Sequence, residues 1–354
     1  MKLGIIGLPQ SGKTTLFNAL TRGNQPIATS GGRFEVHTGV VDVPDGRVDR
    51  LSAMFKPRKT IYAKVTYADI AGLEGGSSNI SGALLNQLTQ MDGFVNVIRC
   101  FEDESVPHPS GSVNPGRDIT AMDAELLLND LIAVERKLER LAEERKKGGG
   151  RDKAIIEREI VLFERFKTHL ESDHPLREIE LSAEEEKTLA GFGFLTRKPM
   201  LILLNLAEGQ AAPAIQYPHA RSAVVALQGK LEMDIAQLSA DDAQLFMEEY
   251  HISELGLNRV ISLSYDLLGL QSFFTVGEDE VRAWTVRRGA SAVEAAGVIH
   301  TDLAKGFIRA ETVPYHDLVS LGGMAEARGK GKLRLEGKEY IVKDGDILHV
   351  RFNV

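Results

Sequence analysis

Cysteine is nearly absent from this sequence, whose 354 residues include a single cysteine, Cys100. One cysteine excludes an internal disulfide framework and favours a reducing compartment, so we expect a cytoplasmic protein. Long hydrophobic runs are also lacking, because no apolar stretch approaches the length of a membrane span. The nine histidines show no H-x-x-x-H spacing and no pairing with cysteine. The sequence therefore predicts no metal site made by the protein alone.

Positive charge is in the minority, with 42 lysines and arginines against 50 aspartates and glutamates, a net charge of −8. This balance argues against a protein that coats nucleic acid non-specifically over its whole surface. A local basic cluster is nevertheless present, and it consists of Arg145, Lys146, Lys147, Arg151 and Lys153. The cluster is either a solvated loop or a contact with RNA or a ribosome.

Near-continuous apolar runs indicate strands that are buried on both faces. They cover residues 3–6, 93–101, 199–205 and 221–227, and a further strand is expected from residue 61 to Asp69, followed by a Gly-containing loop. Such runs, separated by helical patterns, predict an α/β fold with a mostly parallel sheet. The connection from 101 to 199 is too long for one crossover helix, so it must contain an insertion.

The insertion is predicted to be an α-helical coiled-coil hairpin at about residues 122–190. Its first helix has a heptad-like seam made of Leu127, Leu131, Val134, Leu138 and Leu141. A similar stripe runs from Ile156 to Leu170, after the glycines at 148–150. We expect this seam to be the packing face of the hairpin itself.

The last eighty or so residues differ in character from the rest. Short strand-like segments separated by Gly-Lys and Asp-Gly turns surround one short helix at "SAVEAAGVIH". This order predicts a small mixed sheet that grasps one helix. We place the boundary near Thr275, which gives domains of 1–275 and 276–354.

The segment "GLPQSGKT", from Gly7 to Thr14, follows a strand and opens a helix, as a phosphate-binding P-loop requires. Backbone amides and the helix N-terminus cradle phosphates in such a loop. Lys13 is expected to reach the β- and γ-phosphates, and the Thr14 hydroxyl is expected to bind Mg²⁺. The candidate nucleotide-binding residues of this loop are Gln10, Ser11, Gly12, Lys13, Thr14 and Thr15.

The segment "DIAG" begins with Asp69 at a strand end and matches the D-x-x-G element of GTPase-type P-loop proteins. The Asp69 carboxylate is expected to hold Mg²⁺ through a water, and the Gly72 amide to approach the γ-phosphate. Leu73 stands where Ras-type enzymes carry a glutamine that orients water. An aliphatic side chain cannot orient water, so hydrolysis must be slow or must use another group.

The segment "NLAE", from Asn205 to Glu208, stands at a strand end, where a doubly wound sheet binds its ligand. Asn205 can hydrogen-bond a purine edge, while Leu206 and Glu208 replace the lysine and aspartate that read guanine. Backbone amides near Ala226 and Leu227 are expected to complete the base-side loop. These replacements remove the case for GTP without establishing ATP.

These motifs together resemble those of the YchF/Obg-like ATPase family, in the TRAFAC class of P-loop NTPases. The resemblance extends to "EVRAWTVRRGASAVEAAGVIHTDLAKGFIRAE" and "YIVKDGDILHVRFNV", and covers nearly the whole chain. It implies an OBG-type G domain interrupted by a helical coiled coil, followed by a β-grasp, ubiquitin-like TGS domain. It also implies Mg²⁺, a preference for ATP over GTP, and association with ribosomes, translation control or stress responses.

The sequence departs from the family pattern at several positions. Gln10, Ser11 and Thr14 occupy variable places of the P-loop, and Arg33 aligns with the threonine that completes the Mg²⁺ shell. Thr29 or Ser30 could replace that threonine. A GTPase of the same architecture and a module that holds nucleotide without hydrolysing it therefore remain alternatives to a slow ATPase.

Overall fold

The computed structural model describes residues 1–25, 36–70, 80, 82–147, 150–250, 252 and 254–353. These residues form two compact units. The first comprises Met1–Gly39 and Thr66–Leu257, and the second comprises Val40–Val65 and Asn258–Val354. The boundary expected near Thr275 falls inside strand β8 (Leu270–Val276), which pairs within the sheet of the second unit.

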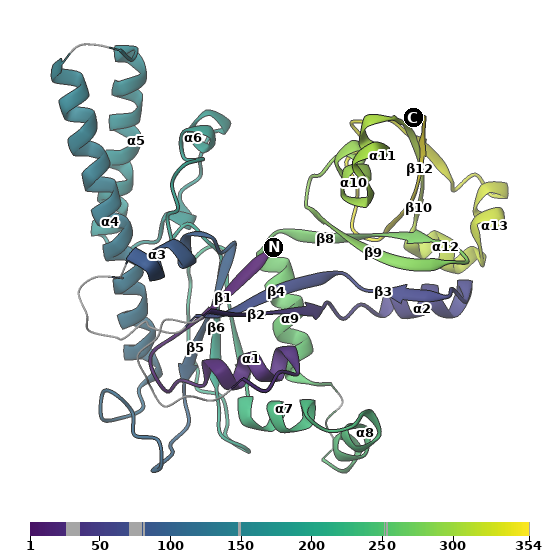
Figure 1. The fold of residues 1–354 in the computed structure, drawn as a ribbon, viewed down its shortest axis with the longest axis horizontal. Coiled ribbons are helices and arrows are strands. Elements are labelled where there is room, and N and C mark those ends of the chain that lie inside the picture. The colour runs from purple at the N-terminus through teal and green to yellow at the C-terminus, as the bar shows by residue number, and fades with distance from the viewer. Residues whose placement is uncertain are drawn as a thin grey trace. The chain divides into compact units, whose positions relative to one another are not determined.

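A six-stranded sheet in the order β2-β4-β1-β5-β6-β7 forms the centre of the first unit (Figure 1). Its strands are β1 (Lys2–Ile6), β2 (Val36–Asp42), β4 (Lys64–Ile70), β5 (Gly93–Arg99), β6 (Met200–Asn205) and β7 (Ser222–Leu227). All pairs from β4 to β7 are parallel. Every residue of β5 and β6 is buried, which confirms the α/β class predicted from the apolar runs.

The first unit also contains helices between and after the strands of this sheet. They are α1 (Lys13–Thr21), α3 (Gly82–Thr89), α4 (Pro115–Lys147), α5 (Lys153–Glu171), α6 (Ala183–Thr188), α7 (Gly229–Ala236) and α8 (Ala240–Glu249), with a 3₁₀ turn at Leu176–Glu178. Side chains of α3 and of the first turns of α4 pack on the sheet in one buried cluster that contains Leu84, Leu88, Met122 and Leu126. The same cluster contains Leu8, Ile70 and Leu206, which are neighbours of the P-loop, Asp69 and Asn205 in the sequence.

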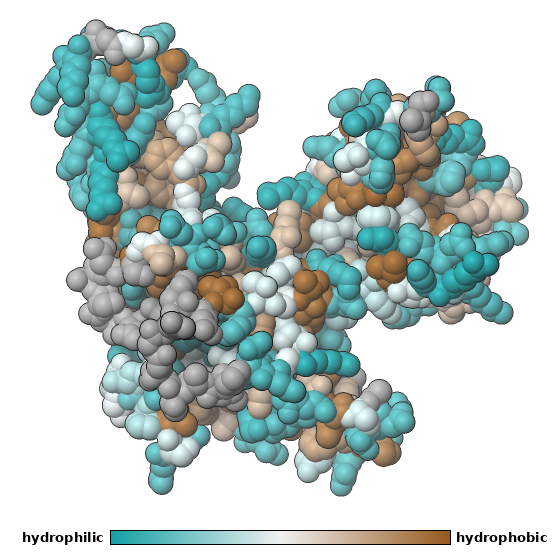
Figure 2. Space-filling view, in the orientation of Figure 1, coloured by the Kyte–Doolittle hydropathy of each residue, from teal (hydrophilic) through white to brown (hydrophobic). Residues whose placement is uncertain are grey.

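The inserted helices α4 and α5 pack against each other as an antiparallel pair (Figure 1). Leu127, Val134 and Leu141 of the predicted seam are buried, and they meet Phe163 and Phe166 of α5. The heptad-like stripe is therefore the internal packing face of the hairpin, as expected. The long face of α4 that is visible in Figure 2 is mostly hydrophilic.

The single strand expected over residues 61–69 is wrong. The structure has two strands there, β3 (Lys59–Ile61) and β4, and they belong to different sheets. β3 runs parallel to β9 in the sheet of the second unit, whereas β4 runs parallel to β1 in the sheet of the first unit. The chain passes from the second unit to the first between Val65 and Thr66, inside β4.

The second unit is a mixed sheet in the order β11-β10-β12-β8-β9-β3. Its strands besides β3 and β8 are β9 (Glu280–Arg287), β10 (Phe307–Pro314), β11 (Arg334–Glu336) and β12 (Asp346–Phe352). Its helices are α2 (Gly46–Phe55), α9 (Gly256–Leu267, of which the first two residues belong to the other unit), α10 (Ala292–Ile299), α11 (Thr301–Lys305), α12 (Tyr315–Leu321) and α13 (Met324–Gly329).

The arrangement of this sheet is that of a β-grasp. β12 lies between β8 and β10 and is parallel to β8, while β8–β9 and β10–β12 are antiparallel pairs. Ala292, Ala295 and Ala296 of α10 pack against Phe273 and Phe307 of the sheet. The small alanine side chains on this face of α10 let the helix lie close to the sheet. The structure thus has the small mixed sheet around one helix that the sequence predicts. Among the described residues, no helix is both long and apolar enough to cross a bilayer.

Candidate nucleotide-binding site

The P-loop leaves the carboxyl end of β1, the strand whose neighbours β4 and β5 lie on opposite sides of it. In an open parallel sheet the crevice at such a reversal of strand order is the expected ligand site. Asp69 in β4 and Asn205 in β6 stand at the same edge of the sheet. Three motifs that are far apart in the sequence are thereby brought to one place.

Backbone geometry explains the glycines of the loop. Gly12 precedes α1 with φ of 95°, a conformation that side chains rarely adopt, and a Cβ there would lie 2.2 Å from Asn205 Nδ2. A Cβ on Gly7 would lie 2.5 Å from the carbonyl oxygen of Val97. Both positions therefore admit only glycine, as the motif predicts.

The other loop residues are placed differently from one another. Gln10 is exposed and adopts φ of 61°, whereas Ser11 is buried, with its hydroxyl packed beside Gly7. The backbone of Ser11 is therefore the part that remains for ligand binding. Thr14 and Thr15 are half-buried in the first turn of α1.

Lys13 is folded back onto its own loop. Its Nζ donates to the carbonyl oxygens of Gly7 at 2.9 Å and Leu8 at 2.8 Å. Burial lowers the pKa of Lys13 from its ordinary value to about 8, against the opposing charge of Asp69. A phosphate ligand would provide this amine with negative charge in place of neutral carbonyls.

We expect nucleotide binding to take up a proton in alkaline solution. The free protein loses the Lys13 charge as the pH rises through about 8, whereas bound phosphates raise that pKa and keep the amine protonated. Proton uptake on ADP binding should therefore be small near pH 7 and grow towards one proton as the pH rises to about 9 and above. Calorimetry in two buffers of different ionisation enthalpy measures this uptake. Equal heats in both buffers near pH 9 would contradict the assignment.

Thr14 and Asp69 provide two oxygens of the kind that Mg²⁺ prefers. The Thr14 hydroxyl donates to Asp69 Oδ2 at 2.8 Å. Burial raises the pKa of Asp69, while the hydrogen bond from Thr14 and the charge of Lys13 oppose that rise. A buried carboxylate and a hydroxyl at hydrogen-bond distance, beside a phosphate loop, fit the oxygen ligand set of a Mg²⁺–nucleotide complex.

Asn205 connects the P-loop to the segment after β7 through two hydrogen bonds. Its Nδ2 donates to the carbonyl of Ser11 at 2.9 Å, and its Oδ1 accepts from the amide of Gly229 at 3.1 Å. A Cβ on Gly229 would lie 2.7 Å from that oxygen. One donor hydrogen and one lone pair of the side chain remain for a purine edge.

Leu206 and Glu208, which follow Asn205 in the motif, differ in their exposure to solvent. Leu206 is only 7% exposed and its amide donates to the carbonyl of Leu227 at 2.8 Å, whereas Glu208 is exposed. Ala226 and Leu227 end β7 and pair with Leu204 and Asn205. The lysine position of guanine-reading proteins thus holds a buried aliphatic side chain.

Gln210 is a residue of this site that sequence patterns did not identify. Its Oε1 accepts from the amide of Ala207 at 2.8 Å, and its Nε2 donates to the carbonyl of Cys100 at 2.7 Å. It thereby fastens the loop that carries Glu208 to the end of β5. The contact with Cys100 spans 110 residues, so no local spacing signals it.

Several expected site residues lie outside the described part of the chain. They are Gly72 and Leu73 in the D-x-x-G segment, and Thr29, Ser30 and Arg33 in the loop before β2. Their predicted roles stay predictions.

Known proteins resemble this chain over its whole length. The ribosome-binding ATPase YchF of Bacillus subtilis is 41% identical over 370 residues, which cover 99% of each chain. The chain belongs to the YchF family. The YchF protein of Escherichia coli O157:H7, which bears the same name, is also 41% identical, over 100% of this chain and 99% of its own.

Family-level and structural matches agree with this membership. A family described as 50S ribosome-binding GTPase matches residues 2–147, and the YchF C-terminal family, described as a protein of unknown function, matches residues 270–353. The structure of the Schizosaccharomyces pombe YchF GTPase superposes with a TM-score of 0.83 at 31% identity, covering 99% of this chain and 97% of that one. The predicted YchF resemblance and fold class are confirmed. The YchF relatives themselves are named ATPase in bacteria and GTPase in fission yeast, so their names leave the nucleotide open.

Proposed function

We propose that this YchF-family chain binds and slowly hydrolyses ATP in preference to GTP, and that its nucleotide state governs association with the ribosome in the cytoplasm. The observation that carries the proposal is the meeting of the P-loop, the Thr14–Asp69 pair and Asn205 at one sheet edge. Phosphate release from ATP compared with GTP, both with Mg²⁺, tests it.

Each residue has a distinct part in phosphate chemistry. Lys13 places a positive charge at the transferred phosphate, and the amides at the start of α1 hold the other phosphate oxygens. Thr14 and Asp69 would hold Mg²⁺, which would neutralise charge on the phosphates. Asn205 keeps the loop in the conformation that these contacts need, because it ties Ser11 to Gly229. The apolar Leu73 supports slow turnover, since it cannot orient water.

The base side supports adenine. Guanine recognition uses a carboxylate that accepts from two ring donors and a lysine stem along the ring. Here Leu206 is buried and offers only apolar contact, and Glu208 is longer than aspartate and approaches from the exposed loop held by Gln210. Adenine lacks the 2-amino group, so it leaves no such donor unpaired. The names of the bacterial relatives, which are called ATPases, also support a preference for ATP.

The ribosome association rests on the names of the bacterial relatives and on exposed cations of the second unit. Arg287 at the end of β9 and Lys305 at the end of α11 are exposed. Arg282 and Arg288 are engaged, the first over the Trp284 ring at 3.8 Å and the second with Asp266 at 2.7 Å. Lys305 also has an acidic neighbour, Asp302, but that ion pair is long, at 3.8 Å, and the lysine side chain is 80% exposed. Arg287 and Lys305 are therefore the cations that a phosphate backbone could meet with least rearrangement.

Reversing these two charges, Arg287→Glu with Lys305→Glu, should weaken ribosome co-sedimentation by on the order of tenfold, because each loses an attraction to RNA phosphates. ATP affinity should stay the same, since both residues are outside the nucleotide site. The variant Lys146→Glu with Lys147→Glu reverses two charges at the hairpin tip, the other basic cluster that could contact the ribosome, and a loss of co-sedimentation confined to this variant would assign the contact to the hairpin instead. Wild-type co-sedimentation of the Arg287 and Lys305 variant would refute this surface.

A further inference from the structure

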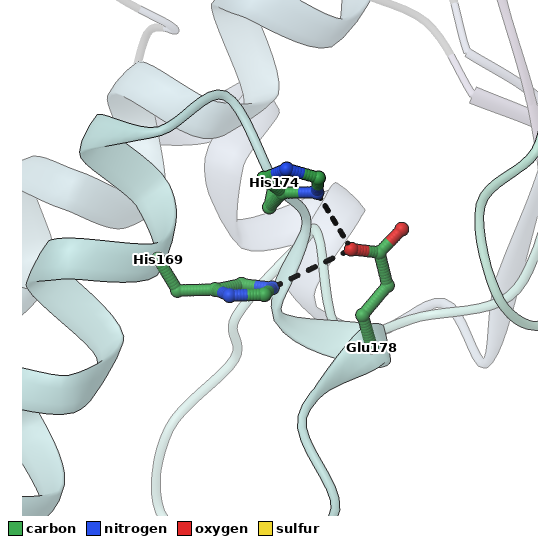
Figure 3. A group of neighbouring side chains, drawn as sticks. All are labelled: His169, His174 and Glu178. Atoms are coloured by element: carbon green, nitrogen blue, oxygen red, sulfur yellow. Dashed lines mark hydrogen bonds and ion pairs between the residues drawn. The ribbon is translucent and has the colours of Figure 1, made fainter.

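Three histidines converge on the carboxylate of Glu178 where α5 ends. Figure 3 shows two of them, His169 and His174, with Glu178. His174 Nδ1 lies 2.9 Å from Glu178 Oε2, and His169 Nε2 lies 3.5 Å from the same oxygen. His219 Nδ1 lies 2.6 Å from the other oxygen, Oε1. None of the four residues belongs to the P-loop or to the strand ends that form the nucleotide site.

The backbone after α5 explains how histidines five positions apart come together. Asp173 adopts φ of 60°, a left-handed conformation that reverses the chain. The amide of His174 then donates to the carbonyl of His169 at 3.2 Å, and the two rings lie 5.3 Å apart between centroids. The following 3₁₀ turn brings Glu178 back to both rings. The usual helical spacing of metal ligands is absent, which is why the sequence predicts no such site.

His219 is held firmly by its surroundings. Its ring packs edge-on against Tyr217 with centroids 4.7 Å apart. The Tyr217 hydroxyl accepts from Arg177 at 2.7 Å and donates to Asp123 at 2.8 Å. Arg177 is itself buried and donates to the carbonyl of Ala220 at 3.0 Å. These contacts fix His219, which in turn fixes the rotation of the Glu178 carboxylate.

We propose that His169, His174 and Glu178 form a binding site for a divalent cation of the Zn²⁺ type, and that His219 is the positioning residue of its carboxylate. Two imidazole nitrogens and one carboxylate oxygen, with water in the fourth place, are a donor set typical of Zn²⁺. A histidine that orients a ligating carboxylate through its second oxygen is the kind of outer contact that raises metal affinity.

The geometry is close to what such an ion needs. The three candidate ligand atoms lie within 4.8 Å of one another. Tetrahedral bonds of about 2.0–2.1 Å place ligand atoms about 3.4 Å apart. The 3.5 Å separation of His169 from Glu178 already matches, and the 2.9 Å separation of His174 must open by only about half an ångström. The side chain of His174 is 53% exposed, so an ion and its water can enter.

The position in the fold also favours a cation. His169 lies in the last turn of α5, where the helix dipole presents partial negative charge. An ion bound there would link the end of the hairpin to Glu178 and, through His219, to the segment that precedes β7.

The test is a titration of tag-free, chelator-treated, full-length protein with Zn²⁺ alone, followed by calorimetry. We expect one ion to bind per chain. Glu178→Gln and His174→Gln should each weaken binding at least about tenfold, and His219→Gln should weaken it by about tenfold through the misplaced carboxylate. Co²⁺ bound in the same place should show the visible absorption of a tetrahedral site, and this absorption should be lost in His174→Gln.

The matched control is His349→Gln, which removes an exposed histidine of β12 and should bind Zn²⁺ like the wild type. ADP binding by each variant, measured in parallel, should be unchanged and shows that the variant is folded and that the ion is not at the P-loop. If Glu178→Gln fails to fold, the Zn²⁺ affinity of His174→Gln decides the test, because that side chain is exposed and its replacement should not disturb folding. The absence of saturable Zn²⁺ binding by the wild type, or wild-type affinity in His174→Gln, overturns the proposal.

Discussion

Replacing Lys13 by alanine should lower nucleotide affinity at least about a hundredfold and abolish phosphate release, while the fold stays intact. The amine is expected to make charge-assisted hydrogen bonds to two phosphates, each worth about 1.5–3 kcal/mol, so about 3 kcal/mol or more is lost. The fold should survive because the empty site gains little from the charge. Burial already lowers the pKa of Lys13 to about 8, and its present partners are only the carbonyls of Gly7 and Leu8.

The chain offers a matched control for this substitution in Lys198. Its Nζ also donates to two main-chain carbonyls, those of Leu88 at 2.7 Å and Thr89 at 2.8 Å, and burial likewise lowers its pKa to about 8. Lys198→Ala should therefore bind and hydrolyse nucleotide like the wild type, measured by calorimetry and phosphate release. Normal binding by Lys13→Ala, or an equal loss in both variants, would contradict the role assigned to the P-loop lysine.

The double substitution Leu206→Lys with Glu208→Asp should shift the preference from adenine towards guanine nucleotides by about 5- to 150-fold. It restores the Asn-Lys-x-Asp set, in which the carboxylate pairs with two guanine donors, each unpaired donor costing about 1–3 kcal/mol. The new lysine must extend from a buried position, since Leu206 is 7% exposed and packs in the core of the first unit. Its long stem can lie along the apolar surface while the amine reaches the ligand.

Leu206→Met is the control for the double substitution, because it keeps volume and polarity and should leave the ratio of ADP to GDP affinities unchanged. An unchanged ratio in the double variant as well would show that loops other than 205–208 read the base.

Local motifs were the part of this site that sequence could predict. The P-loop from Gly7 to Thr14 is a continuous segment whose backbone geometry requires glycine at fixed places, so the pattern carries its own structure. The meeting of Thr14 with Asp69 also followed, because parallel strands end at a common edge. Both inferences depend on short-range chemistry or on a general rule of the fold.

Contacts between segments that are far apart in the chain could not be predicted from the sequence. Nothing in the apolar run at 61–69 shows that β3 pairs with a strand more than 200 residues later. Gln210 acts through a carbonyl, which any residue could supply. The histidine cluster depends on the reversed backbone at Asp173 and on His219, 41 residues from Glu178. These features arise from tertiary packing, which periodicity does not encode.

The most direct test of the proposed ATPase is steady-state phosphate release by the wild-type chain from ATP and from GTP, with Mg²⁺, over the background of Lys13→Ala. The account predicts slow release from both nucleotides, with kcat/KM for ATP about 5- to 150-fold above that for GTP. Equal or higher kcat/KM for GTP would contradict the base-side argument. No release from either nucleotide above the Lys13→Ala background would show that the site holds nucleotide without hydrolysing it.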